Sequence, residues 1–240
     1  MNSLAAHAKL TLSLRITGVR DDGYHLIDAE MISLDLADDI VLTPDSSGID
    51  VDGEFADGVP TDDTNLVSKA LLLAGASAHV RITKNIPHGG GLGGGSTDAA
   101  AVLRWAEFTD LVAASRLGAD IPFCMIGGRA RVRGIGEVVE PLPRRQVDIT
   151  LVIPPMHAST PQVYAAWDAM GGPHHESGND LEPAALHVVP GLSDIKRRIT
   201  EVVKTPPMLA GSGSTWFVEG HHRELLSELP DCRVVFTRAL

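Results

Sequence analysis

Alternating apolar and polar residues mark the first strand of the chain, in AKLTLSLRI at residues 8–16. A period of two places the apolar residues on one face of a strand and the polar residues on the other. The pattern therefore predicts a half-buried strand whose polar face carries Lys9, Thr11, Ser13 and Arg15.

Strand and helix patterns alternate along the rest of the chain, and no internal repeat is present. Alternating or continuous apolar runs predict strands, whereas apolar residues spaced three and four apart predict helices. The predicted strands span residues 30–44, 48–53, 78–84, 148–155, 215–220 and 232–240, with a hairpin over 127–142. The predicted helices span residues 64–77, 97–108, 192–204 and 223–229, with a short helix within 108–117. Residues 20–28 have the composition of a turn, and residues 168–180 that of a surface loop.

This order of elements predicts an α+β fold of two units with mostly antiparallel sheets. The apolar pattern is weakest in PLPRRQVD, at residues 141–148, so we place a boundary near residue 145. The prediction is one domain over residues 1–145 and a second over residues 146–240, both of ordinary domain size.

A glycine-rich segment, PHGGGLGGGSTDAAA at residues 87–101, lies between a predicted strand and a predicted helix. Glycine lets backbone N–H groups approach a ligand without a Cβ, and N–H groups converge with the dipole at a helix N-terminus. Ser96 or Gly95 is expected to cap this helix, with Asp98 in its first turn. A linker or a tight turn is the alternative, but neither needs a strand before it and a helix after it. The segment therefore predicts a cradle for phosphate.

Two common phosphate loops do not fit this segment. A Walker A loop requires lysine before the serine or threonine, but Gly95 precedes Ser96. Gly89, Gly91 and Gly94 satisfy the G-x-G-x-x-G pattern, yet the segment is richer in glycine than a dinucleotide-binding turn requires.

Charge and cysteine content narrow the partners and the compartment. A formal net charge of -11 argues against nucleic acid and against an anionic membrane surface, because both attract basic proteins. Two cysteines provide no disulfide framework, which favours the cytoplasm. The sequence contains no apolar run of the roughly 18 residues needed for a membrane span, and its start does not match a secretory signal.

The glycine-rich segment resembles the phosphate loop of the GHMP kinases. Three more stretches match the family in order, AKLTLSLRITGVRDDGYH at 8–25, LGADIPF at 117–123 and LAGSGST at 209–215, and NDLE at 179–182 fits as well. The resemblance implies a ribosomal-protein-S5-domain-2-like N-terminal unit, a ferredoxin-like C-terminal unit and an ATP-dependent small-molecule kinase. The D-G-Y-H tetrad points to the branch that phosphorylates the 2-hydroxyl of a cytidine-diphosphate-linked methylerythritol, in the non-mevalonate isoprenoid pathway.

The resemblance also implies a role for individual residues. Lys9 and Asp120 would form the catalytic pair, with the carboxylate acting on the acceptor hydroxyl and the cation close to the γ-phosphate of ATP. Mg²⁺ is expected to accompany ATP, and no residue is assigned to it as a ligand. The implied nucleotide-binding residues are Asn65, Pro87, His88, Gly89, Gly90, Gly91, Leu92, Gly93, Gly94, Gly95, Ser96 and Thr97.

The substrate would lie against a second group of residues. Tyr24 is expected to stack on the cytosine, Tyr164 to cover its other face and His25 to hydrogen-bond the base, because aromatic faces are a general way to hold a base. Thr11 stands where the family usually has asparagine. The implied substrate-binding residues are Thr11, Tyr24, His25, Tyr164, Gly211 and Gly213.

Each of these residues also has a structural explanation that the sequence leaves open. Lys9 could be an exposed strand lysine, Asp120 a turn residue, Tyr164 a helix core residue and Asn65 only a helix cap. Gly211 and Gly213 could form a simple strand-entry turn.

Two other functions therefore stay open, namely another GHMP kinase with a different small substrate and a non-catalytic nucleotide-binding relative.

The resemblance also implies that the region between Trp105 and Leu117 is shorter than in relatives. The sequence predicts no oligomeric state.

Overall fold

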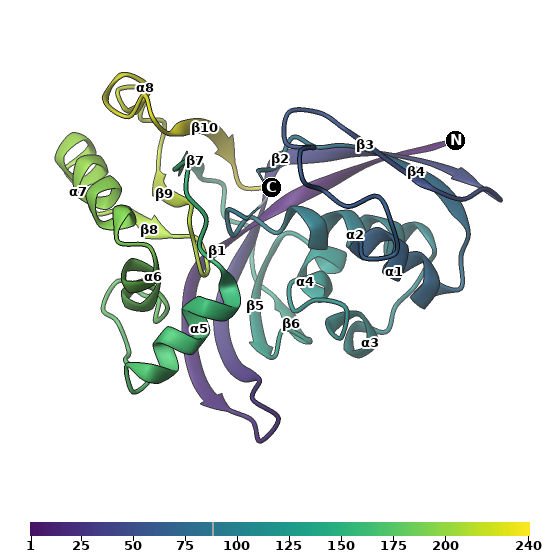
Figure 1. Cartoon of the computed structure of the whole chain (residues 1–240), viewed down its shortest axis with the longest axis horizontal. Helices are drawn as coiled ribbons and strands as arrows, with labels where there is room; N and C mark the ends of the chain where they lie inside the picture. The colour runs from purple at the N-terminus through teal and green to yellow at the C-terminus, as the bar shows by residue number, and fades with distance from the viewer. Residues whose placement is uncertain (88) are drawn as a thin grey trace.

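Two sheets and two groups of helices make up the fold, and the computed structural model describes residues 1–87 and 89–240 (Figure 1). The strands are β1 (Asn2–Val19), β2 (His25–Pro44), β3 (Ile49–Asp52), β4 (Ala78–Thr83), β5 (Arg129–Gly134), β6 (Val138–Pro141), β7 (Asp148–Ile153), β8 (Met208–Leu209), β9 (Trp216–Glu219) and β10 (Arg233–Arg238). The helices are α1 (Leu66–Ala74), α2 (Gly94–Trp105), α3 (Leu111–Ser115), α4 (Ile121–Ile126), α5 (Thr160–Ala169), α6 (Glu182–Val188), α7 (Gly191–Val203) and α8 (Leu225–Glu228).

The first sheet is built on the long β1–β2 hairpin. Its order is β3-β4-β2-β5-β6, with β1 paired to β2, and β3–β4 is its parallel pair. Helices α1 to α4 lie together beside this sheet (Figure 1). Val67 of α1 and Leu103 of α2 are buried with Ile40 and Val80 of the sheet, so the apolar faces of helices and strands share one core.

The second sheet has the order β10-β7-β9-β8 and is antiparallel throughout. Helices α5, α6 and α7 lie on its side of the molecule, away from α1 to α4 (Figure 1). The core between this sheet and its helices contains Trp216 and Ile195, and also Leu14 and Ile16 from the far end of β1. One strand therefore contributes to the cores of both halves.

The predicted boundary near residue 145 falls in the connection between β6 and β7. A further core cluster joins Leu10 and Ile32, from before this point, to Ile149 and Phe217, from after it. The two halves thus pack against each other through apolar side chains, and the division into residues 1–145 and 146–240 stays a prediction.

Several elements differ from the sequence prediction. Strand β1 is twice as long as the alternating segment, and β2 already begins at His25 within the predicted turn. Helices α4, α5 and α6 were not predicted; each has proline at one of its first two positions, where the missing N–H is tolerated. Across the part of the chain that the structure describes, none of the helices has the length and apolar character to cross a membrane.

Candidate active site

Strand β1 brings Lys9 next to Asp120. The Lys9 ammonium Nζ lies 3.1 Å from Oδ2 of Asp120, which directly precedes α4, and it donates a hydrogen bond of 3.2 Å to the Thr11 hydroxyl. The lysine side chain is only 6% exposed, whereas the aspartate is 29% exposed. The pair therefore offers a buried cation and a carboxylate that a ligand can reach, and the catalytic roles of both residues stay a prediction.

The glycine loop packs directly against this pair. Gly89, Gly91 and Gly93 have φ angles of +70°, +77° and +71°, a region that other residues rarely adopt. A Cβ on Gly93 would lie 2.7 Å from Cγ of Lys9, and the Lys9 backbone N–H donates to the Leu92 carbonyl at 3.0 Å. Glycine is needed here for the backbone conformation and for the close approach to Lys9.

Helix α2 begins three residues earlier than the sequence predicted. Its N-cap is Gly93, so the expectation of a cap at Ser96 or Gly95 is wrong, and Gly93 contributes no side-chain cap. Asp98 is consequently the fifth residue of the helix rather than part of its first turn. A helix start without a side-chain cap leaves its N–H groups for an anionic ligand, which fits a phosphate group.

A second loop closes over the same place. A Cβ on Gly91 would lie 2.2 Å from the Ala210 carbonyl oxygen, and one on Gly211 would lie 3.7 Å from Nζ of Lys9. The amide of Asn179 donates to the carbonyls of Leu209 and Gly211 at 2.9 and 2.7 Å. Asn179 thus fixes the loop of residues 209–215 beside Lys9, a role that sequence reasoning missed although it matched the NDLE stretch.

Asp180, next in the chain, ties the segment before α6 to β1. Its carboxylate accepts hydrogen bonds from Arg15 (2.6 Å), the Ile16 backbone (3.0 Å), the His174 ring (2.8 Å) and the His175 backbone (3.0 Å). Burial alone would raise the pKa of Asp180, but these hydrogen bonds outweigh it and hold the pKa below its usual range. The end of the predicted surface loop is therefore buried structure, and that expectation was wrong for this part.

Replacing Asp180 with alanine is expected to lower the free energy of unfolding by about 2–4 kcal/mol, because several donors lose a buried acceptor. Urea unfolding at pH 7 measures this loss. Asp194→Ala is the matched control: its partner Arg197 is solvent-exposed, so a change within about 0.5 kcal/mol is expected. Since the pKa of Asp180 is lowered on folding, its contribution should also fade as the pH drops through that pKa. Equal losses in the two variants would contradict this account.

An open cavity of about 480 Å³ is lined by Ala119, next to Asp120 in the chain, and by the predicted base-binding residues. Tyr24, His25 and Tyr164 all line it, and the rings of His25 and Tyr164 are 4.7 Å apart. Tyr24 is 59% exposed, and the Arg20 guanidinium lies over its ring, 6.0 Å from the centroid, so part of the ring is open to a ligand. Burial and the charge of Asp120 raise the pKa of Tyr164, which places this phenol within the electrostatic field of the Asp120 carboxylate.

His25 has a partner that the sequence did not reveal. Its Nε2 lies 2.8 Å from Oδ1 of Asp168, and its ring packs edge-on against Trp167. Both contacts come from α5, which also carries Tyr164. Helix α5 therefore fixes the orientation of His25 in the cavity.

Two of the predicted nucleotide-binding residues have local structural roles, and a third lies outside the residues that the structure describes. Asn65 caps α1 by accepting the Val67 N–H at 2.8 Å, and its contact with a nucleotide stays a prediction. The Thr97 hydroxyl donates to the His7 carbonyl at 2.6 Å and so anchors α2 to β1. His88 lies outside the described residues.

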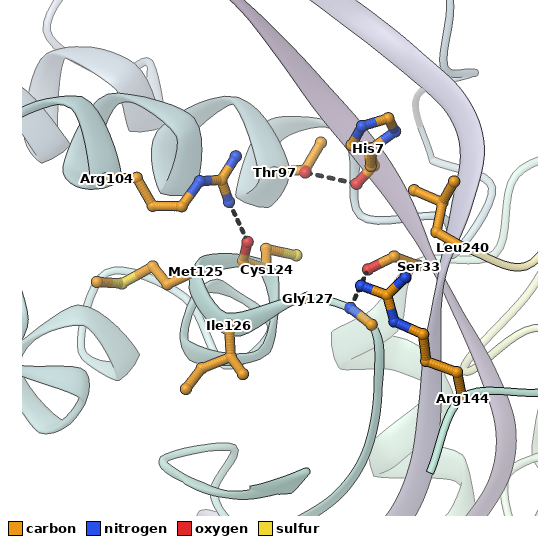
Figure 2. Close-up of a pocket in the computed structure, with 11 residues that line it drawn as sticks. His7, Ser33, Thr97, Arg104, Cys124, Met125, Ile126, Gly127, Arg144 and Leu240 are labelled. Carbon is orange, nitrogen blue, oxygen red and sulfur yellow. Dashed lines mark hydrogen bonds between the residues drawn. The ribbon is translucent and has the colours of Figure 1, made fainter. Parts of the chain in front are cut away.

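A separate cavity of about 220 Å³ lies between α2, α4 and the β1–β2 hairpin, and Thr97 is one of the residues that line it. Figure 2 shows Arg104 reaching from α2 to the Cys124 carbonyl, and Arg144 lying beside Ser33. Burial raises the pKa of the Cys124 thiol to about 12, so this cysteine stays protonated and unreactive at neutral pH. Among the described residues that line this cavity, Thr97 is the one that belongs to the predicted site.

Below the glycine loop lies a buried ionic cluster that sequence reasoning also missed. The Lys84 ammonium contacts the carboxylates of Asp38 and Asp98, and all three residues are almost fully buried. Asp38 lies within β2, Lys84 directly follows β4, and Asp98 lies in the second turn of α2. These residues are too far apart in the chain for a motif of fixed spacing to reveal that they pair.

Comparison with known proteins defines the class to which this fold and site belong. The family profile for the GHMP kinases N-terminal domain matches residues 65–128, which include the glycine loop and Asp120. A crystal structure of mevalonate kinase from Methanococcus jannaschii superposes with a TM-score of 0.61 at 13% identity, covering 100% of this chain and 98% of that one. The fold is therefore that of the GHMP kinases, and the predicted α+β architecture is confirmed.

Relatives with higher identity narrow the class to one family. The 4-diphosphocytidyl-2-C-methyl-D-erythritol kinases of Paracoccus denitrificans and Ruegeria pomeroyi are 37% and 35% identical, covering 89% and 88% of this chain and 85% and 86% of their own. A crystal structure of 4-(cytidine 5'-diphospho)-2C-methyl-D-erythritol kinase superposes over 100% of both chains with a TM-score of 0.80 and 30% identity. The chain belongs to the 4-diphosphocytidyl-2-C-methyl-D-erythritol kinase family.

Proposed function

We propose that this protein transfers the γ-phosphoryl group of ATP to the 2-hydroxyl of 4-diphosphocytidyl-2-C-methyl-D-erythritol. The observation that carries the proposal is the place of the Lys9–Asp120 pair. It lies between an uncapped helix start with its glycine loop and a cavity lined by Tyr24, His25 and Tyr164. A phosphate site, a proton acceptor and a base-sized aromatic pocket thus adjoin one another.

In this proposal, Asp120 accepts the proton from the acceptor hydroxyl, since its carboxylate is exposed enough for a ligand to reach, whereas the Lys9 side chain is buried. Lys9 pairs with that carboxylate and adds positive charge where negative charge develops during transfer. The loop around Gly93 orients the phosphates with backbone N–H groups. Phosphoryl transfer requires mainly such positioning and charge stabilisation, which these residues supply.

The loop geometry supports ATP as the phosphoryl donor, because the loop leads into the start of α2, which has no side-chain cap and can offer its N–H groups to phosphate. Mg²⁺ accompanies nucleotides in this chemistry and neutralises phosphate charge. Among the described residues no group of three or more His, Cys, Asp or Glu side chains could hold a metal ion. The ATP phosphates would therefore provide most of the ligands, as is common for Mg²⁺. A cytoplasmic location is part of the same proposal.

One assay tests the function directly. ADP release is measured with ATP and the cytidine-linked substrate, and in parallel with mevalonate, homoserine and galactose. The proposal predicts turnover with the first substrate alone. Turnover with another alcohol would indicate a different GHMP kinase activity, and nucleotide binding without any turnover would indicate a non-catalytic relative.

Tyr24→Ala tests the base pocket. Loss of a stacking face costs about 1–3 kcal/mol, so KM for the cytidine-linked substrate should rise by about 5- to 150-fold. KM for ATP should change little, because the glycine loop lies on another wall of the site. Steady-state kinetics with each substrate varied in turn measure both values.

Tyr164→Phe is the matched control for the pocket, since stacking uses the ring and not the hydroxyl, and it should be nearly silent. If Tyr24→Ala weakens ATP and leaves the cytidine-linked substrate unaffected, the two pockets have been assigned the wrong way round.

A further inference from the structure

The cluster of Asp38, Lys84 and Asp98 joins the two ends of the glycine loop. Lys84 directly follows β4, where the chain enters the loop, and Asp98 lies in α2, just after the chain leaves it. The Lys84 ammonium is 2.6 Å from Oδ2 of Asp98 and also contacts Oδ2 of Asp38. One buried cation therefore connects both flanks of the loop to β2.

Asp38 also fixes the backbone at the loop entrance. Its Oδ1 accepts hydrogen bonds from the N–H groups of Asn85 and Ile86, at 2.5 and 2.8 Å. These two residues are the last before Pro87 and the glycines. The conformation of the chain where it enters the loop is thus set by the carboxylate that holds Lys84.

The cluster touches the loop itself. A Cβ on Gly94, the first residue of α2, would lie 3.3 Å from Nζ of Lys84 and 3.3 Å from Cγ2 of Ile86. The ammonium is therefore packed against the start of the helix whose N–H groups would hold phosphate. A glycine loop has little intrinsic stiffness, because glycine has the largest conformational freedom in the unfolded chain. Its shape must be fixed by contacts at its ends.

The cluster is costly to bury, which argues that it does more than fill the core. Asp38 and Lys84 are 0% and 2% exposed, and Asp98 is 3% exposed. Within the described part of the chain, Oδ1 of Asp98 has no hydrogen-bond partner. Burial also raises the pKa of Asp98. Apolar residues of similar volume would often stabilise such a place equally well or better.

We propose that Asp38, Lys84 and Asp98 are positioning residues that hold the glycine loop in its phosphate-binding shape. None of the three contacts the reacting atoms; they act through the loop. The proposal rests on the proposed function, because it assumes that the loop binds ATP phosphates. It predicts that a defect in the cluster appears in nucleotide affinity before it appears in the binding of the other substrate.

The test compares Lys84→Met, Asp98→Asn and the double variant in the full chain. Binding of a non-hydrolysable ATP analogue is measured by calorimetry, together with KM for both substrates. The analogue Kd should rise at least ~10-fold in each single variant, because small misplacements of a binding group have large effects. KM for the cytidine-linked substrate should stay within about two-fold. The fold-increase in the analogue Kd of the double variant should be smaller than the product of the two single-variant increases, because the residues act as one unit.

Lys196→Met is the matched control, because Lys196 also pairs with a buried carboxylate, that of Glu182, but this pair joins α7 to α6 rather than the two flanks of the glycine loop. It should lower Tm to a similar extent and leave the analogue Kd unchanged. If the cluster variants also lower Tm and leave Kd unchanged, the cluster only stabilises the fold and the proposal is overturned. Should Lys84→Met fail to fold, Asp98→Asn, which keeps the size of the side chain, gives the same comparison.

The wild-type chain separates failure of this proposal from failure of the proposed function. If the wild type binds the analogue and the variants bind it equally well, the positioning role alone is wrong. If the wild type binds no nucleotide, the proposed function is wrong, and the positioning role is overturned with it.

Discussion

Replacing Asp120 with alanine is expected to lower kcat by at least ~100-fold, because the variant lacks a carboxylate to take the proton of the acceptor hydroxyl. The Asp120 carboxylate is the one that lies 3.1 Å from the buried Lys9 ammonium. Steady-state turnover with both substrates saturating measures the effect. Binding of ATP should survive, because the glycine loop and the start of α2 are unchanged.

Asp110→Ala provides the control for removal of a carboxylate, because Asp110 directly precedes α3 as Asp120 directly precedes α4. Asp110 caps α3 and accepts the Ala113 N–H at 2.9 Å, so its loss affects a helix end and not the site. Its kcat should stay within about three-fold of the wild type, as expected for a residue that does not act in the transition state. If Asp120→Ala retains a similar kcat, Asp120 is not the proton acceptor. If Asp120→Ala instead abolishes ATP binding, the residue supports the loop and its assignment changes.

Gly93→Val should abolish measurable ATP binding, with a rise in Kd of at least ~100-fold. Residue 93 has a φ of +71°, which a β-branched residue adopts only with strain. A Cβ there would also lie 2.7 Å from Cγ of Lys9. The substitution is therefore expected to disturb both the helix start and the position of Lys9, and calorimetry with a non-hydrolysable ATP analogue measures the outcome.

Gly18→Ala is the matched control for the loss of a glycine. A Cβ at residue 18 would meet Cδ1 of Leu26 at 3.7 Å, which is an ordinary contact, and the residue lies near the end of β1. Binding should be unchanged in this variant. Undiminished affinity in Gly93→Val would show that the phosphates lie elsewhere.

The sequence predicted most strands and helices, because their periodicity is local. The alternation in residues 8–16 identified the centre of β1 but not its beginning, since residues 2–7 do not alternate, and a register shift between His7 and Lys9 separates their pairing with β2 from that of the alternating segment. The start of α2 was predicted too late, because the glycines at 94 and 95 have poor helix propensity. Here the need for a bare N-terminus outweighs propensity.

The candidate site was predicted where a motif carried it and missed where only folding could assemble it. Lys9 and Asp120 are 111 positions apart in the chain, and the resemblance alone suggested that they meet. In the sequence, Lys84 was only the last residue of a predicted strand. Its ionic partners were missed, because Asp38 and Asp98 are brought to it by the folding of β2 and α2. Asp168, which orients His25, belongs to a helix that gave no clear apolar pattern.

Strand β1 has a consequence for how such an enzyme can change during evolution. Its first half packs with the helices around the nucleotide loop, and its second half, with Leu14 and Ile16, completes the core of the other sheet. Lys9, the proposed catalytic lysine, lies between the two halves. The substrate-side half cannot be exchanged as a module between relatives, because part of its core belongs to the other half of the chain. New specificities in this architecture would therefore arise from point substitutions and loop changes around a shared strand, rather than from domain shuffling.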